Sequence, residues 1–395
     1  MPNNPSSSAS CEVPGNFPES AARKVLAGLS GGVDSSVAAL LLKKRGYTVT
    51  GVTMSVYGGP VAGGPQTGGN ACYDCGEEED IAAAALFAKN IGIPYQVFDC
   101  TKQYKSLVLD YFKNTYLAGQ TPNPCVRCNH MLKFGLLPEL ARQNGLDYDY
   151  FATGHYARVE FSERHNRYVL RRGVDPRKDQ AYFLYRLDQT QLSRALFPLG
   201  GMYKQDVRAI AAEHGLAVHN KPDSQDFYSG GYTELLDLAG LPGNIVNREG
   251  KVLGRHTGYW HFTPGQRKGL GIAAAEPLFV LELDPARNEV VVGSYAQSLY
   301  SGCTLNELRI NVPLHELTPE ERANLRCKMR SAQQPVAVTL QNPSPCTLAP
   351  EQLELRFNEP QTGVAPGQSL VLYLDDLVIG GGIIQKRKPN GERHA

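Results

Sequence analysis

The chain has 395 residues, of which 42% are hydrophobic and 20% charged, and its formal net charge is +1. This composition is typical of a globular protein of two or three domains, and the bulk charge neither requires nor excludes a nucleic-acid partner. No apolar run approaches the roughly 18 residues of a membrane span, so we expect no membrane partner.

The two ends of the chain are expected to be tails, at 1–22 and 389–395. The first is rich in Ser, Pro and Asn, and it has neither an apolar core nor a basic residue before Arg23, so it is not a secretory signal. We therefore expect a cytoplasmic protein with reduced cysteines. Among nine cysteines in such a compartment, paired ones more often indicate metal or redox chemistry than disulfides.

Residues 23–220 alternate short apolar runs with helical stretches. The expected strands are 25–29, 48–54, 95–99 and 149–153, and the expected helices are 34–45, 77–91, 101–117 and 130–144. This order is typical of an α/β domain, a parallel sheet with helices on both faces. The segment Gly58–Asn70, rich in Gly and Pro, interrupts the pattern as a long loop, and its length suggests function or mobility.

The remainder of the chain has a different hydrophobic pattern. Residues 221–287 show weak periodicity and are expected to form a small central domain. Residues 288–388 are expected to form an antiparallel β-barrel, from the short alternating runs EVVVGS, LRCKMR, VAVTLQ, LELRF, SLVLYL and VIGGGII. Between 158 and 186, eight Lys and Arg face four Asp and Glu. This local excess fits either a solvated surface hairpin or a nucleic-acid contact.

The strongest motif runs from Gly28 to Ser36 and reads GLSGGVDSS, between the first strand and the first helix. Glycines let the backbone turn tightly, and hydroxyls and amides at a helix N-terminus bind anions. The loop lacks the GK[ST] of a Walker A motif. The alternative is a plain glycine turn.

Two other positions fit a nucleotide site, because they follow strands where open α/β sheets bind ligands. Met54 ends the second strand, and Gly154 follows the strand at 149–153. Each is also compatible with an ordinary strand end.

The order strand, SGGxDS, helix resembles the PP-loop ATP pyrophosphatases. The resemblance implies that ATP is cleaved between its α and β phosphates, and that Asp34 helps to organise Mg²⁺ and the phosphates. It also implies the following ATP-binding positions: Gly28, Leu29, Ser30, Gly31, Gly32, Val33, Asp34, Ser35, Met54 and Gly154.

A second motif places a Cys-x-x-Cys pair, Cys125 and Cys128, after a proline-stiffened loop and before a helix. A thiol at the positive end of a helix is expected to have a lowered pKa. Such a thiolate can attack, carry a persulfide or bind a metal. A structural zinc site is the alternative.

The stretch TPNPCVRCNHMLKF (121–134) resembles the tRNA-specific 2-thiouridylase family. Six further stretches share the resemblance: GLSGGVDSS, ATGHYAR, KDQAYFLY, GQRKGLGI, APGQSLVLY and GGGII. Together they cover nearly all of 24–384, in order. The resemblance implies a PP-loop domain, a central domain and a C-terminal β-barrel. It also implies sulfur insertion at C2 of uridine 34 in tRNAs for Lys, Glu and Gln, a cysteine desulfurase or sulfur-relay donor, and a monomer.

Carried over position by position, the resemblance gives Cys128 the nucleophilic role and places Cys125 in the loop that meets the target base. Positions that the resemblance assigns to tRNA are Asn123, Pro124, Cys125, His155, Lys178, Asp179, Gln180, Arg330 and Gln368. An exposed Arg or a turn Gln with no such role is the alternative for the two barrel positions.

The chain departs from the family at two positions. Cys125 stands where better-known members have Asp, and Tyr228 falls at the position of their second cysteine. A tyrosine cannot carry a persulfide. Cys72 and Cys75 form another Cys-x-x-Cys pair, and two hypotheses follow. Cys72 or Cys125 replaces the missing thiol, or Cys72, Cys125 and Cys128 hold a [4Fe–4S] cluster.

Two other classes of protein remain open. A PP-loop nitrogen ligase of the argininosuccinate or GMP synthetase type would need no cysteine pair, so the loop around Cys125 argues against it. A non-enzymatic tRNA-binding protein would need no intact nucleotide loop, and SGGVDSS is intact.

Overall fold

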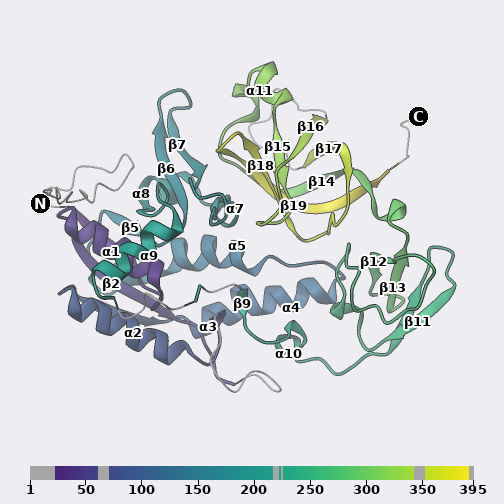
Figure 1. Cartoon of the computed structure of the whole chain (residues 1–395), viewed down its shortest axis with the longest axis horizontal. Helices are drawn as coiled ribbons and strands as arrows, with labels where there is room; N and C mark the ends of the chain where they lie inside the picture. The colour runs from purple at the N-terminus through teal and green to yellow at the C-terminus, as the bar shows by residue number, and fades with distance from the viewer. Residues whose placement is uncertain (1–22, 61–70, 217–221, 224–225, 342–351, 391–395) are drawn as a thin grey trace, which may run out of the picture.

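The computed structural model describes residues 23–60, 71–216, 222–223, 226–341 and 352–390. The expected tail at 1–22, most of the glycine-rich loop and the last residues of the chain lie outside these ranges. Figure 1 shows three parts, a helix-rich N-terminal domain, a small sheet and a barrel.

The N-terminal domain is built on a five-stranded parallel sheet in the order β4-β2-β1-β5-β8. Its strands are β1 (Lys24–Gly28), β2 (Thr48–Ser55), β4 (Tyr95–Asp99), β5 (Tyr150–Ala152) and β8 (Ala195–Leu196). Along β1, Val25 and Ala27 belong to one buried cluster and Leu26 to another. Because successive strand side chains point to opposite faces, both faces are covered, and the predicted α/β sheet is confirmed.

Helices cover the two faces in separate groups. The first group packs on Val25 and Ala27 and comprises α1 (Val33–Lys44), α2 (Glu77–Asn90) and α9 (Lys204–Glu213). The second packs around Leu26 and comprises two long helical stretches, α3 to α4 (Thr101–Tyr104, Asp110–Leu117) and α5 to α6 (Pro124–Cys128, Leu137–Gln143). The first three predicted helices are present within a residue of their expected bounds. The fourth, expected at 130–144, begins six residues earlier, at Pro124, so Cys125 and Cys128 lie inside the helix and not before it.

Each stretch of the second group contains a π-helical segment, at Lys105–Leu109 and at Asn129–Leu136. The second lies directly before Pro138, near the start of α6. A proline inside a helix removes a backbone donor and crowds the carbonyl four residues earlier, and a wider turn relieves that crowding. The widened turn begins at the residue after Cys128.

A hairpin leaves this domain and joins the barrel. It consists of β6 (Ala157–Ser162) and β7 (Arg167–Arg172), and β7 meets the last barrel strand through Arg171 and Leu377. Arg171 and Arg158 form ion pairs with Asp376 of the barrel. Much of the local excess of positive charge therefore holds the hairpin to the barrel. Two short helices follow, α7 (Ala181–Leu184) and α8 (Gln189–Arg194).

The central part contains a four-stranded mixed sheet in the order β11-β10-β13-β12. Its strands are β10 (Gly243–Val246), β11 (Val252–His256), β12 (Phe279–Asp284) and β13 (Glu289–Gly293). We expected Glu289–Gly293 to be the first barrel strand, and this is wrong, because β13 pairs with β10 and β12. A short alternating strand carries no information about which sheet it joins.

A small parallel pair lies between the first two parts. It joins β3 (Ala71–Tyr73) to β9 (Asp226–Tyr228), and the short helix α10 (Tyr232–Leu236) follows. The pairing brings together segments that are more than 150 residues apart in the sequence, so local patterns could not reveal it.

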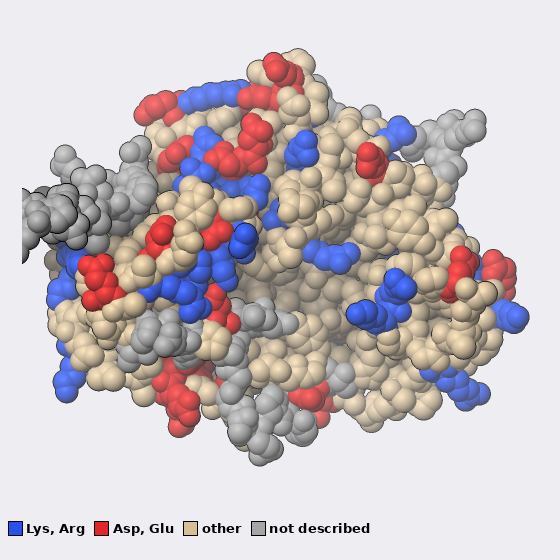
Figure 2. All heavy atoms as spheres, in the orientation of Figure 1, with Lys and Arg blue, Asp and Glu red and all other residues tan. Residues whose placement is uncertain are grey.

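The C-terminal part is a closed antiparallel barrel in the order β14-β17-β16-β15-β18-β19, closed by β14 against β19. Its strands are β14 (Tyr300–Ile310), β15 (Arg326–Lys328), β16 (Val336–Gln341), β17 (Leu353–Gln361), β18 (Ser369–Leu374) and β19 (Leu377–Pro389), with α11 (Pro319–Ala323) between β14 and β15. The barrel is confirmed, although its long first strand was not predicted. In Figure 2, Lys and Arg side chains flank a hollow between the three parts.

Candidate active site

The loop between β1 and α1 is shaped by glycines. Gly31 has φ +68°, and a Cβ added there would lie 2.3 Å from the carbonyl oxygen of Asp80. Gly32 caps α1 without any side-chain hydrogen bond. The loop thus requires glycine at position 31, and among the described residues no N-cap side chain accepts from the amides at the start of α1. A phosphate group fits this arrangement.

Two serine hydroxyls line the same turn. The Oγ atoms of Ser30 and Ser35 lie 3.2 Å apart, and Ser35 Oγ also accepts from the backbone amide of Ser30 at 3.1 Å. Ser36 is buried and donates to the carbonyl of Gly32 at 2.9 Å. The hydroxyls hold the turn in shape, and they fit the pyrophosphate-binding role expected of the motif.

Asp34 is held by two residues that sequence reasoning missed. Lys204 Nζ donates to its two carboxylate oxygens at 2.7 and 2.8 Å, and the Tyr156 hydroxyl donates to Oδ1 at 2.9 Å. Burial and the charge of Asp34 raise the pKa of Tyr156. Lys204 also pairs with Asp223 at 2.7 Å. The sequence held one weak indication of this role. Lys204 is the first residue of a helix, where its positive charge is unfavourable next to the helix dipole unless an acidic group compensates it.

The other two expected nucleotide positions lie at the same edge of the sheet. Gly28 and Met54 end neighbouring parallel strands, and Gly154 follows β5. A Cβ on Gly154 would lie 2.7 Å from the backbone of Asp34 and Ser35. The segment after β5 therefore packs directly on the glycine loop, as a shared ligand site requires.

The cysteine loop enters a helix through a regular N-cap. Asn123 Oδ1 accepts from the amide of Val126 at 3.2 Å, and Pro124 occupies the first turn. Cys125 is half-buried and Cys128 is 9% exposed. Burial raises the pKa of Cys128 to about 11, and the nearby Lys133 only partly opposes this. The lowered pKa expected for a thiol at this helix end is therefore wrong for Cys128, because desolvation outweighs the helix dipole.

Three thiols act electrostatically on one ammonium group, that of Lys133. Burial alone would lower the pKa of Lys133, but Cys72, Cys128 and Cys125 raise it. The same three cysteines add to burial in raising the pKa of Tyr104. That Cys72 converges with the pair Cys125 and Cys128 at one site stays a prediction.

A metal centre does not fit these thiols as they are arranged. In the described part of the chain, no three His, Cys, Asp or Glu side chains are grouped so that they could hold a metal ion. The cation on which these three thiols act is the ammonium of Lys133, whose pKa they raise. The residues of the predicted [4Fe–4S] cluster do not match such a group, and no step below depends on one.

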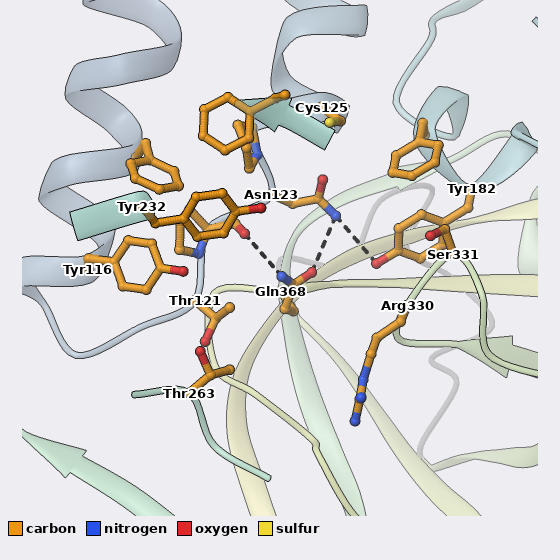
Figure 3. A pocket seen from close by; sticks show the side chains of 15 residues that line it. Tyr116, Thr121, Asn123, Cys125, Tyr182, Tyr232, Thr263, Arg330, Ser331 and Gln368 are labelled. Atoms are coloured by element: carbon orange, nitrogen blue, oxygen red, sulfur yellow. Dashed lines mark hydrogen bonds between the residues drawn. The ribbon is translucent and has the colours of Figure 1, made fainter. Parts of the chain in front are cut away.

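A pocket of about 290 Å³ opens beside Cys125, where all three parts of the protein meet (Figure 3). Asn123 Nδ2 donates to Gln368 Oε1 at 3.3 Å, and Gln368 Nε2 donates to the carbonyl of Pro122 at 3.0 Å. Arg330 lies on the barrel side. Aromatic side chains form the opposite wall, namely Phe112, Tyr116, Phe227 and Tyr232. The pocket combines apolar walls with a few polar groups, as sites for small planar ligands do.

The segment Lys178–Gln180 is engaged within the protein. Lys178 pairs with Asp223 at 2.6 Å, and Gln180 Oε1 accepts from the amide of Tyr156 at 2.9 Å. The side chain of Asp179 is 1% exposed and pairs with Arg172 at 2.8 Å. These contacts brace the residues that hold Asp34.

His155 lies between the two motifs. Its Nδ1 is 2.8 Å from the Thr153 hydroxyl, and its ring packs against Phe134 and Phe197. Burial and the charge of Lys133 lower the pKa of His155 to about 3, so its ring is neutral at physiological pH. His155 thus lies between Gly154, which packs on the glycine loop, and Phe134, in the helical stretch that follows Cys128.

Comparison with known families covers almost the whole chain. The model described as "tRNA methyl transferase HUP domain" matches residues 23–228. The "tRNA methyl transferase PRC-barrel domain" matches 236–294, and the "Aminomethyltransferase beta-barrel domain" matches 301–384. The boundary between the last two lies after β13, which agrees with the sheet topology.

Curated relatives share this full length. The chain is 43% identical to the tRNA-specific 2-thiouridylase MnmA of Endomicrobium trichonymphae over 366 residues, which span 91% of this chain and 98% of that protein. It is 44% identical to the protein of the same name from Geotalea uraniireducens over 374 residues, 92% of this chain and 95% of that one.

Proposed function

The chain belongs to the family of tRNA-specific 2-thiouridylases, and on that premise we propose that it replaces the C2 oxygen of uridine 34 in tRNA by sulfur, at the expense of ATP. The observation that carries the proposal is that one domain contains both an anion-binding loop suited to ATP and cysteine thiols suited to sulfur transfer. Gly154 packs on the backbone of Asp34 and Ser35 in the anion-binding loop, and the next residue, His155, packs on Phe134 of the helix that carries Cys125 and Cys128.

The first step is activation of the base. The triphosphate of ATP lies against the amides at the start of α1, with Lys204 beside it, held by Asp34. The uridine leaves the anticodon stack and enters the pocket beside Cys125, as bases do in enzymes that modify them. Its O2 attacks the α-phosphate, and pyrophosphate leaves. Asn123 and Gln368 are placed to hold the base edge.

Mg²⁺ belongs to this proposal, since it neutralises phosphate charge when bound with ATP. Asp34 is the carboxylate at the loop that would meet it. Three hydrogen bonds from Lys204 and Tyr156 occupy about three of the roughly four acceptor positions of a carboxylate, which leaves one for the ion or its water.

The second step is sulfur transfer. The adenylated O2 is a good leaving group, and a sulfur nucleophile at the cysteine cluster displaces AMP from C2. The sulfur comes from a donor such as a cysteine desulfurase or a relay protein. We propose tRNAs for Lys, Glu and Gln as substrates, and a monomeric, cytoplasmic enzyme. No helix in the described residues is both long and apolar enough to cross a bilayer.

The segment Lys178–Gln180 and Arg330 have different proposed roles toward tRNA. Arg330 faces the pocket and is suited to a phosphate of the anticodon loop. Lys178, Asp179 and Gln180 support the Asp34 site from behind, and of the three Lys178 is the most open to contact with tRNA.

The two rival classes are not favoured. The reaction of a nitrogen ligase does not require three thiols that act on a lysine. Passive binding of tRNA does not require a loop that accepts only glycine at position 31. Nucleoside mass spectrometry of tRNA from a strain lacking the gene tests all three. The proposal predicts loss of 2-thiouridine at position 34 and its return with the wild-type gene. Unchanged 2-thiouridine would contradict it.

A further inference from the structure

We propose that Cys72, on β3, is the thiol that receives sulfur and works with Cys128, in place of the cysteine that Tyr228 has replaced. This inference rests on the proposed function and deepens it by assigning its second thiol. It depends on where β3 lies, on which thiols are open to solvent, and on the geometry of a helix.

The pairing of β3 with β9 puts Cys72 next to position 228. Ala71 is in register with Asp226 and Tyr73 with Tyr228, so Cys72 lies opposite Phe227. Phe227 and Cys125 line the same pocket. Cys72 therefore lies one strand away from Phe227. Because successive strand side chains point to opposite faces, Cys72 shares the face of Phe227, which lines the pocket, and not the face of Tyr228.

Tyr228 itself is committed to a structural role. It is buried, and its hydroxyl donates to Glu234 at 2.8 Å. Its ring lies 6.4 Å from that of Tyr73, which stacks on Tyr104 at 5.3 Å. These rings anchor β3 and β9 to the helix α3, and they fix the backbone on both sides of Cys72.

The thiols differ in access. Cys72 is exposed between two buried neighbours, whereas Cys128 is buried. A donor protein must reach the thiol that accepts its sulfur, so Cys72 is suited to receive it and Cys128 to act inside the site. Cys125, on the same short helix as Cys128, lines the pocket together with Phe227, the residue opposite Cys72, and Cys72 adds to the raised pKa of Cys128. Lys133, on which both thiols act, stabilises an anionic sulfur.

Helix geometry argues against Cys125 as the partner of Cys128. Both lie inside α5, three residues apart. Cβ atoms at that spacing in a helix are about 5–6 Å apart. A disulfide needs about 3.5–4.5 Å. A disulfide between them would therefore require the start of α5 to adjust, whereas Cys72 comes from a separate strand, β3.

The steps balance as follows. The Cys72 thiolate takes the outer sulfur of a donor persulfide, and the donor leaves as a thiol. The resulting Cys72 persulfide attacks C2 of the adenylated uridine, a carbon–sulfur bond forms, and AMP leaves with the electron pair of the C2–O bond. The Cys128 thiolate then attacks the Cys72 sulfur, giving a Cys72–Cys128 disulfide and freeing the thiocarbonyl. An external dithiol supplies two electrons and two protons to restore both thiols.

The test uses the full-length protein with unmodified tRNA, ATP and cysteine persulfide as the sulfur source. Three quantities are measured: tRNA-dependent pyrophosphate release, 2-thiouridine by mass spectrometry, and the position of added sulfur or disulfide by peptide mapping after one turnover without reductant. The variants are Cys72→Ser and, as the matched control from the same Cys-x-x-Cys pair, Cys75→Ser.

Cys72→Ser is expected to keep pyrophosphate release and to lose thiolation by more than about 100-fold, as when a nucleophile is removed. Cys75→Ser is expected to retain both. In the wild-type chain the added sulfur maps to Cys72 and the disulfide joins Cys72 to Cys128. Wild-type thiolation by Cys72→Ser, or added sulfur on another cysteine, overturns the inference. Mapping in the wild-type chain decides it even if the variant misfolds. Failure of the proposed function can be distinguished from failure of the Cys72 assignment, because in the first case the wild-type chain releases no pyrophosphate with tRNA.

Discussion

Lys204 Nζ bridges both carboxylate oxygens of Asp34, at 2.7 and 2.8 Å, across 170 residues of sequence. The pair links the N-terminus of α9 to the glycine loop at the start of α1. Lys204 is 9% exposed, so little solvent screens the interaction. The Lys204 ammonium is therefore held in position beside the glycine loop, where we propose that negative charge builds up on the pyrophosphate as it leaves.

Lys204→Ala is therefore expected to slow tRNA-dependent pyrophosphate release by about 10²–10³-fold, as for loss of one preorganised donor. The measurement is a pyrophosphate assay at saturating ATP. Lys89→Ala, at an exposed position near the end of α2, is the control and should leave the rate unchanged. A wild-type rate in Lys204→Ala would show that Asp34 works without this partner.

Gly31→Ala is expected to abolish ATP binding, because the added methyl would meet the carbonyl of Asp80 at 2.3 Å as well as a backbone of φ +68°. Gly145→Ala is the matched control, with φ +80° and nothing within 4 Å of its Cβ. The control should lose only about 1–2 kcal/mol of unfolding free energy, the cost of left-handed backbone alone. Calorimetric ATP binding and thermal unfolding measure both. Equal behaviour of the two variants would contradict a role for close packing at Gly31.

Alkylation of Cys128 is expected to quicken as pH rises, because the reactive form is the thiolate and the pKa is about 11. Below that pKa the thiolate fraction grows about tenfold per pH unit. Lys133 lowers the pKa of Cys128, so Lys133→Met should raise it further and slow alkylation at every pH below it.

The check is the pH profile of iodoacetamide labelling, read by peptide mass. Lys102→Met, at an exposed position on α3, is the control and should match the wild-type profile. A Lys133→Met profile that overlays the wild type would mean that the ammonium does not act on this thiol.

Gln368→Ala removes the hydrogen bonds that join the barrel to Asn123 and to the carbonyl of Pro122. Each is worth about 1 kcal/mol net, so kcat/KM for tRNA should fall by roughly 5- to 30-fold. The KM for ATP should not change, because Gln368 is on the pocket and not on the glycine loop. Gln385→Ala, whose exposed side chain bonds only Gln352 in the described residues, is the control. Equal loss in both variants would assign the effect to barrel stability.

Local patterns in the sequence predicted the parts of this protein that local interactions determine. The period of two in the strands, the helical stretches and the glycine loop all follow from neighbouring residues, and each is present in the structure. The helix near the Cys-x-x-Cys pair was also predicted, but its start at Pro124 with Asn123 as its N-cap was not.

What was missed depends on contacts between distant segments. The Lys204–Asp34 pair, the pairing of β3 with β9 and the membership of Glu289–Gly293 in the central sheet join residues that no local pattern relates. The raised pKa of Cys128 was missed for a related reason, because its burial comes from packing between elements. The expected tail at 1–22 and the residues 61–70 lie outside the described part of the chain.

The most direct test of the account is a stoichiometric reconstitution. Purified protein is mixed with unmodified tRNA for Glu, a persulfide donor and ATP labelled at its α-phosphate, and AMP, pyrophosphate and 2-thiouridine are counted together. The account predicts one AMP and one pyrophosphate for each 2-thiouridine formed, all at position 34, and no AMP without tRNA. AMP formation that requires an amine acceptor, or tRNA that returns without sulfur after ATP is consumed in the presence of donor, would contradict it.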